Sequence, residues 1–194
     1  MRQPVAYIPL LSLVCYSVLL AIVLRRAGSD RVRRSFSVYL ATMIVWSLAS
    51  FMMHADLGLL PTIAWNRLVV LGSTAMPITI FSFVRVFIGR SRRALLVAGV
   101  VSLLVTQVLN LCGLVVEAAE IRNGVLDIRY GPAVVVTGLS WLLFIGLAAF
   151  DLVREMARTQ DVVYRNRVRY LIVVIALMFG GSLTNATALQ SYPV

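Results

Sequence analysis

The feature that most constrains this sequence is a series of long apolar runs, each about as long as a helix that crosses a bilayer. Such a helix needs about 20 mostly apolar residues, because a rise of ~1.5 Å per residue must cover ~30 Å of hydrocarbon. The alternating pattern typical of membrane β-barrels is absent. The sequence therefore predicts an all-α polytopic bundle, in one domain over residues 1–194, with six spans at about residues 5–24, 36–53, 63–88, 94–116, 133–153 and 168–189.

The charged residues predict how these spans are oriented. Charged residues make up only 13% of the chain, against about 25% in a soluble domain, and the net charge is +10. Fourteen of the 18 basic residues, all of them arginine, lie in the loops after the first, third and fifth spans or at the span ends beside them, and four lie on the other side. The positive-inside rule makes the arginine-rich side cytoplasmic, so we expect both chain ends to be extracytoplasmic in a multi-pass cell-membrane protein. The positive charge is thus a topology signal and argues against nucleic acid as a partner.

Local patterns predict three further features. Asn123-Gly124 between short alternating segments is a strong hairpin signal, so residues 120–123 should pair with residues 124–128 in a small extracellular β-hairpin. Asp151–Arg154 and Glu155–Arg158 have i,i+3 spacing, which favours ion pairs on a fifth helix that continues into the cytoplasm. Pro77 should bend the third helix, because proline lacks an N–H and collides with the preceding turn.

No motif indicates catalysis or a bound cofactor. His54 is the sole histidine, at a predicted helix end, and has no nucleophile or metal cluster beside it in sequence. Cys15 and Cys112 lie in apolar runs without metal-ligand spacing. We therefore expect a protein that is not an enzyme and that uses no metal or cofactor.

Polar residues at membrane depth are the candidates for a binding site, because they are costly there. Arg67 cannot lose its charge, so it must reach water, headgroups, an internal carboxylate or a ligand. If the outer helix ends surround a cavity, Arg67 would anchor a small anionic or zwitterionic ligand, the asparagines would form hydrogen bonds, and Trp65 would supply an apolar wall. In the competing interpretation Arg67 extends toward the headgroups and the asparagines only join helices. The candidate ligand-binding residues are His54, Trp65, Asn66, Arg67, Asn110 and Asn185.

Several of these motifs also resemble a known family. Trp65-Asn66-Arg67, Leu71-Gly72, Met76-Pro77 and the exit at Arg85 resemble the third helix of the seven-helix N-terminal sensor region of bacterial and archaeal histidine kinases. Residues 124–132 resemble that family's external loop, residues 164–170 the start of its sixth helix, and Tyr192-Pro193 the segment before its seventh. The resemblance implies a sensory input whose seventh helix leads to a kinase or another output domain, and the sequence stops at Val194, before such a helix.

Three functions are consistent with these observations. The leading hypothesis is a membrane-embedded sensory input module of a histidine-kinase-type receptor, which senses a ligand or membrane state at its outer side. The alternatives are a small solute transporter or channel, and a structural membrane subunit. The expected partners are the lipid bilayer, a small anionic or zwitterionic ligand, and a second copy of the chain in a homodimer.

Overall fold

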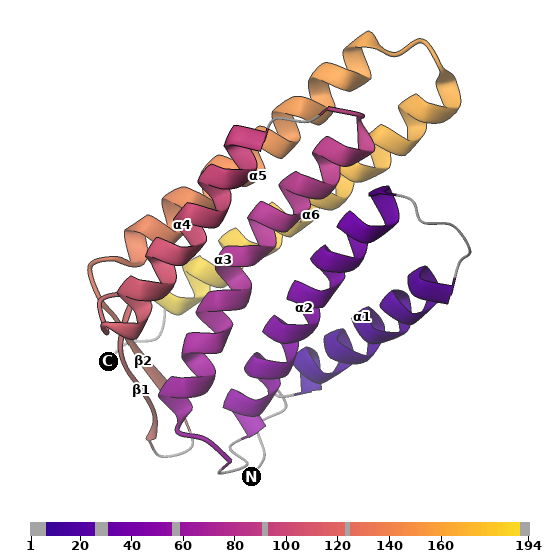
Figure 1. The fold of residues 1–194 in the computed structure, drawn as a ribbon. Coiled ribbons are helices and arrows are strands. Elements are labelled where there is room, and N and C mark those ends of the chain that lie inside the picture. The colour runs from indigo at the N-terminus through magenta and orange to yellow at the C-terminus, as the bar shows by residue number, and fades with distance from the viewer. Residues whose placement is uncertain (1–6, 26–30, 56–58, 91–92, 123–124, 191–194) are drawn as a thin grey trace.

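The protein is a bundle of six helices with a two-stranded hairpin at one end (Figure 1). The computed structural model describes residues 7–25, 31–55, 59–90, 93–122 and 125–190, and the side chains at 122, 125 and 178–190 lie outside the description. The elements are α1 (Tyr7–Arg25), α2 (Arg31–Ala55), α3 (Thr62–Phe87), α4 (Arg93–Leu111), β1 (Val116–Arg122), β2 (Val125–Tyr130), α5 (Val134–Arg158) and α6 (Val162–Gln190). Helices α1 to α5 are each long and apolar enough to cross a membrane, and α6 has 29 residues. The predicted fold class, a helical membrane bundle with a small hairpin, is confirmed.

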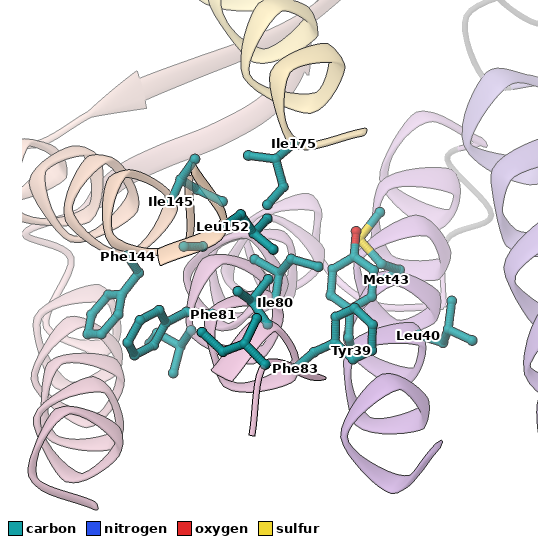
Figure 2. Packing of buried hydrophobic residues seen from close by; sticks show 14 of the residues in the cluster. Tyr39, Leu40, Met43, Ile80, Phe81, Phe83, Phe144, Ile145, Leu152 and Ile175 are labelled. Carbon is teal, nitrogen blue, oxygen red and sulfur yellow. The ribbon is translucent and has the colours of Figure 1, made fainter. Parts of the chain in front are cut away.

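Helix α3 is the central element of the bundle. It packs against α2, α4, α5 and β1, whereas α1 packs mainly against α2, and α6 mainly against α5. Apolar side chains from several helices meet around α3 to form the main core, and Figure 2 shows Phe81 and Ile80 of α3 between Phe144 on one side and Tyr39 on the other. The central position means that both ends of α3 are held by neighbouring elements.

The outer helices present apolar side chains away from the protein. On α4, Val97, Val101, Leu104 and Val108 are each about half exposed or more. A soluble protein would bury such a row, whereas lipid solvates it without cost. These surfaces therefore contact the bilayer.

The hairpin forms with the predicted register. Strands β1 and β2 are antiparallel, with Arg122 opposite Val125 and Glu120 opposite Asp127, so the two-residue connection is Asn123-Gly124. Those two residues lie outside the described ranges. Val116 and Ala119 of β1 pack with Val70 of α3 in a second apolar cluster, so the hairpin is fastened to the central helix.

The predicted fourth span, residues 94–116, is wrong at its C-terminal end. Helix α4 ends at Leu111, and Gly113 takes a φ of 79°, a left-handed conformation that favours glycine and terminates helices. The apolar residues that follow are not in a span, because Val115 and Val116 are buried against α3 as the chain enters β1. Hydropathy alone could not distinguish these two uses of an apolar run.

The middle of α3 is rich in hydroxyl groups that bond to their own helix. Pro77 is fully buried within the continuous helix. The hydroxyls of Ser73 and Thr74 both donate to the carbonyl of Val70, and Thr79 donates to carbonyls one turn earlier. Hydrogen bonds of this kind often accompany helix bends. The bend at Pro77 itself stays a prediction.

Candidate functional site

The structure brings Arg67 and Asn110 together at one end of α3. The Asn110 amide nitrogen donates to the backbone carbonyl of Arg67 at 3.2 Å, and the Arg67 Nη2 reaches the carbonyl of Leu111 at 3.4 Å. Asn110 is fully buried, whereas Arg67 is partly exposed. The two candidate residues that the sequence placed on different spans therefore form one contact between α3 and α4.

The residue before Arg67 on α3 contacts a different helix. Asn66 is 2% exposed, and its Nδ2 donates to Sδ of Met53 on α2 at 3.5 Å. Consecutive residues on a helix are about 100° apart, so Asn66 and Arg67 can contact different neighbouring helices. The predicted set thus divides into an α2 side and an α4 side.

The remaining candidates are placed less closely. His54 donates from Nδ1 to the carbonyl of Ser50 on its own helix, at 2.8 Å. Trp65 is partly buried in the first turn of α3. Asn185 lies on α6, but its side chain is outside the described residues. Among the five candidates whose side chains are described, the structure therefore joins only Arg67 and Asn110 by a hydrogen bond.

Several polar atoms in this region are buried without a hydrogen-bond partner among the described residues. They include Nε of Arg67, Oδ1 of Asn110 and Oδ1 of Asn66. Arg67 also has no carboxylate within ion-pair distance in the part of the chain that the structure describes. A guanidinium without a carboxylate partner can bind a group that carries negative charge, and a free amide oxygen can accept a hydrogen bond from a group that donates.

The opposite end of α3 holds a buried ion pair that the sequence analysis missed. Arg85 Nη1 donates to Oδ2 of Asp151 on α5 at 2.7 Å, and the two residues are 6% and 7% exposed. The Arg85 guanidinium also lies 5.7 Å from the ring centroid of Phe81, within cation–π distance. Arg85 is therefore desolvated but paired.

A second arginine extends this pair into a network. Arg90 Nη2 donates to Oε2 of Glu155 at 3.0 Å, and its Nη1 lies 3.8 Å from Oδ1 of Asp151. Two positive and two negative groups thus close one end of the α3–α5 contact. The predicted pairing of Asp151 with Arg154 and of Glu155 with Arg158 is replaced, because Arg85 of α3 and Arg90, shortly after the end of α3, reach these carboxylates across the α3–α5 contact. The predicted continuation of the fifth helix is correct, since α5 runs to Arg158.

A signal for this pair was present in the sequence. Arg85 and Asp151 are opposite charges that both fall inside predicted spans, 63–88 and 133–153, near the same membrane face. Charges inside spans are expected to find partners in the bundle. Considering the two spans together would have favoured Arg85 over Arg154.

An aromatic stack connects the same end of α3 to α6. The rings of Phe87 and Tyr164 lie 5.7 Å apart, with an interplanar angle of 13°. Burial raises the pKa of Tyr164 above its ordinary value and the Glu155 carboxylate adds to this, while Arg90 acts in the opposite direction. Tyr164 therefore stays neutral and forms part of the packing at this end.

A groove lies beside the hairpin. Its volume is about 430 Å³, and it is lined by Pro61, Thr62, Ile63, Glu117, Ala118, Ala119, Glu120 and Ile121. None of the six candidate residues lines it. The groove is therefore separate from the Arg67–Asn110 contact.

Comparison with families of known proteins gives a match over most of the chain. The family model described as the N-terminal 7TM region of histidine kinase matches residues 8–194. No curated protein and no solved structure matches the chain.

Proposed function

Because this chain belongs to the family of N-terminal 7TM regions of histidine kinases, we propose that it is the sensory input module of a signal-transduction receptor and senses at its outer side. The matched residues, 8–194, correspond to the membrane region of such receptors and not to a kinase domain. Catalysis would then belong to an output domain to which this region is coupled. The apolar outer surfaces of α1 and α4 support the membrane location.

The proposed orientation places the Arg67 end of the bundle outside. It rests on the concentration of 14 of the 18 arginines in the loops and helix ends on the Arg85 side of the bundle. Single cysteines introduced by Ala55→Cys and Thr159→Cys, in a background without Cys15 and Cys112, test it in intact cells. A membrane-impermeant thiol reagent should label the first and not the second, and the reverse pattern would overturn the orientation.

The observation that carries the ligand proposal is the state of Arg67. Arg85 and Arg90 each have carboxylate partners, but Arg67 has none among the described residues. The Nε of Arg67 is buried without a hydrogen bond, as is the Nε of Arg85, so the missing carboxylate is what distinguishes Arg67. A guanidinium in this state is a strong site for a carboxylate or phosphate group. We propose a small anionic or zwitterionic ligand that binds Arg67 and Asn110, with Trp65 as a neighbouring apolar surface. Asn66, His54 and Asn185 remain proposed contributors.

The test uses the full-length receptor, with its output measured as autophosphorylation or reporter expression. Arg67→Ala should abolish the response to the stimulus while the protein still inserts in the membrane. Arg129→Ala is the matched control, because Arg129 is an exposed arginine of β2 at the same end of the bundle. An unchanged response in Arg67→Ala would refute the ligand site.

Two further measurements address the alternatives. Flux of a solute through liposomes that contain the purified protein would favour a transporter or channel over a sensor. Chemical cross-linking in membranes tests the proposed homodimer, and a monomer at all protein densities would exclude it.

A further inference from the structure

A row of buried polar groups lies between α3, α4 and α5 and is not explained by the proposed ligand alone. Five of its atoms have no partner among the described residues: Nε of Arg67, Oγ1 of Thr106, Nε2 of Gln107, Oδ1 of Asn110 and Oγ1 of Thr137. We call this row the polar seam. Within a bilayer, each unpaired group of this kind is costly, because lipid offers no hydrogen bonds.

The three residues of α4 share one face of that helix. Thr106 and Asn110 are one turn apart, and both are fully buried. Gln107 is three residues before Asn110, on the same side. One turn inward from Thr106, Ser102 pairs with Ser140 of α5 at 3.0 Å between the two hydroxyl oxygens. Thr137 is three residues before Ser140, so it lies one turn outward on α5, level with Thr106.

The hydroxyls of the seam differ from four other serine and threonine hydroxyls of the bundle, whereas those of Ser35, Ser37 and Ser47 on α2 are likewise buried without a partner among the described residues. Thr42, Ser73, Thr74 and Thr79 all bond to carbonyls of their own helices. This is the usual way for a helical threonine to satisfy its hydroxyl in a membrane. Thr106 and Thr137 make no such bond among the described residues, and each lies one turn from the Ser102–Ser140 contact that joins α4 to α5.

The inner limit of the seam is tight and apolar. A Cβ added to Gly99 of α4 would lie 2.8 Å from Cγ2 of Ile78 and 3.3 Å from the ring of Phe144. The helices therefore touch closely at Gly99 and carry polar side chains from Ser102 to Asn110. The outer limit is the partly exposed Arg67, whose Nη2 bonds to the carbonyl of Leu111.

We propose that the polar seam binds ordered water molecules that connect Arg67 and Asn110 to Thr106 and Thr137. The seam offers two N–H donors, one amide oxygen and two hydroxyls, and this mixture matches a molecule that both donates and accepts. Buried water typically makes about three hydrogen bonds to groups that lack other partners. The hydrated seam would reach from the outer surface to the Ser102–Ser140 pair, and it does not depend on the proposed ligand.

Thr106→Val tests the hydration, because valine has nearly the same shape and lacks the hydroxyl. If water bridges the hydroxyl, the substitution removes a bond that holds the helices and lowers the thermal unfolding temperature. If the seam is dry, it removes an unpaired polar group and raises that temperature. Thr74→Val is the matched control: Thr74 is equally buried, but its hydroxyl bonds only to Val70 of its own helix, so little change is expected. Thr106→Ser keeps the hydroxyl and should restore most of the loss.

A second measurement uses the unaltered protein in nanodiscs. Hydroxyl radicals that an X-ray pulse forms from bound water oxidise the side chains beside it. Leu103, one turn inward from Thr106, should be oxidised, whereas Phe144, buried against the apolar stretch at Gly99, should not. A raised unfolding temperature in Thr106→Val, or equal protection of Leu103 and Phe144, would overturn the proposal. Neither outcome bears on whether Arg67 binds a ligand.

Discussion

The two ends of α3 each carry an arginine, but the arginines are in opposite states. Arg85 is buried and bonded to Asp151 at 2.7 Å, with Arg90 and Glu155 completing a network of balanced charge. Arg67 is partly exposed, bonds only to a backbone carbonyl at 3.4 Å, and has no carboxylate partner in the described ranges. We call the Arg85 end of α3 closed, because its arginine is ion-paired, and the Arg67 end open, because its arginine has no carboxylate partner among the described residues.

This difference indicates at which end of α3 the contacts can be altered with the smaller loss of free energy. A buried ion pair is strongly held, because separating it leaves a charge without compensation in a medium of low polarity. A guanidinium with unused donors can gain a partner without breaking a bond of similar strength. A stimulus that acts at the Arg67 end, as the proposed function requires, would therefore meet weaker contacts than one at the Arg85 end, where α3 is joined to α5.

The largest effect is expected from opening the closed end. Asp151→Asn leaves the buried Arg85 without a counter-charge and should lower the free energy of unfolding by about 3–5 kcal/mol. Unfolding in mixed micelles or bicelles, followed by circular dichroism, measures this. Glu155→Gln should cost much less, because Arg90 is more exposed than Arg85.

The same comparison predicts a rescue. Replacing both partners, by Arg85→Met with Asp151→Leu, removes the unpaired charge as well as the pair, so much of the lost stability should return. A double variant as unstable as Asp151→Asn would show that packing around these side chains, and not their charge, closes this end of α3.

The sequence predicted the local features of this molecule and missed those that depend on distant residues. The six helices and the hairpin follow from apolar run length and from the Asn123-Gly124 turn, both of which are encoded within short segments. The end of α4 was wrong because residues 114–116 are apolar for a different reason, burial beneath the hairpin. Asp151 was assigned to Arg154 because that partner is near in sequence, whereas Arg85 is 66 residues away.

The candidate site illustrates the same limit. Sequence could identify Arg67 and Asn110 as costly at membrane depth, and the structure joins them. It could not show that Asn66, one residue earlier, faces Met53 on the other side of α3. The neighbour that a side chain of a central helix contacts depends on the positions of the surrounding helices, which short sequence segments do not encode.

Gly72→Ala tests whether the half of α3 that contains Arg67 also packs loosely against α2. Gly72 lies against Trp46 of α2, and a Cβ added there would be 2.7 Å from the Trp46 Cβ and 3.0 Å from its Cα. Because backbone must move, Gly72→Ala should cost about 1–3 kcal/mol of stability. Gly146→Ala is the control, since nothing lies within 4 Å of an added Cβ, and it should be neutral or slightly stabilising. Equal effects at the two glycines would show that α2 and α3 can separate easily.

A third substitution tests whether the closed end includes α6. Tyr164→Ala removes the ring that stacks on Phe87 and should lower stability by about 1 kcal/mol, whereas Tyr164→Phe keeps the ring and should be nearly neutral. A loss in both variants would assign the effect to the hydroxyl and not to the stack. Fluorescence or circular dichroism during denaturant unfolding separates these outcomes.

The smallest effect on stability is expected from Arg67→Ala. A small effect there, beside a large one for Asp151→Asn, would distinguish the two ends of α3. Removing Arg67 breaks one long hydrogen bond to the Leu111 carbonyl and leaves no opposite charge stranded among the described residues. Partly exposed arginines of this kind contribute about 0–1 kcal/mol. Arg67→Ala should therefore unfold within that range of the parent protein, even though it abolishes the response in the full-length receptor. If Arg67→Ala instead destabilised the bundle as much as Asp151→Asn does, the arginines at both ends of α3 would contribute strongly to stability. The proposed division between an open sensing end and a closed end would then fail.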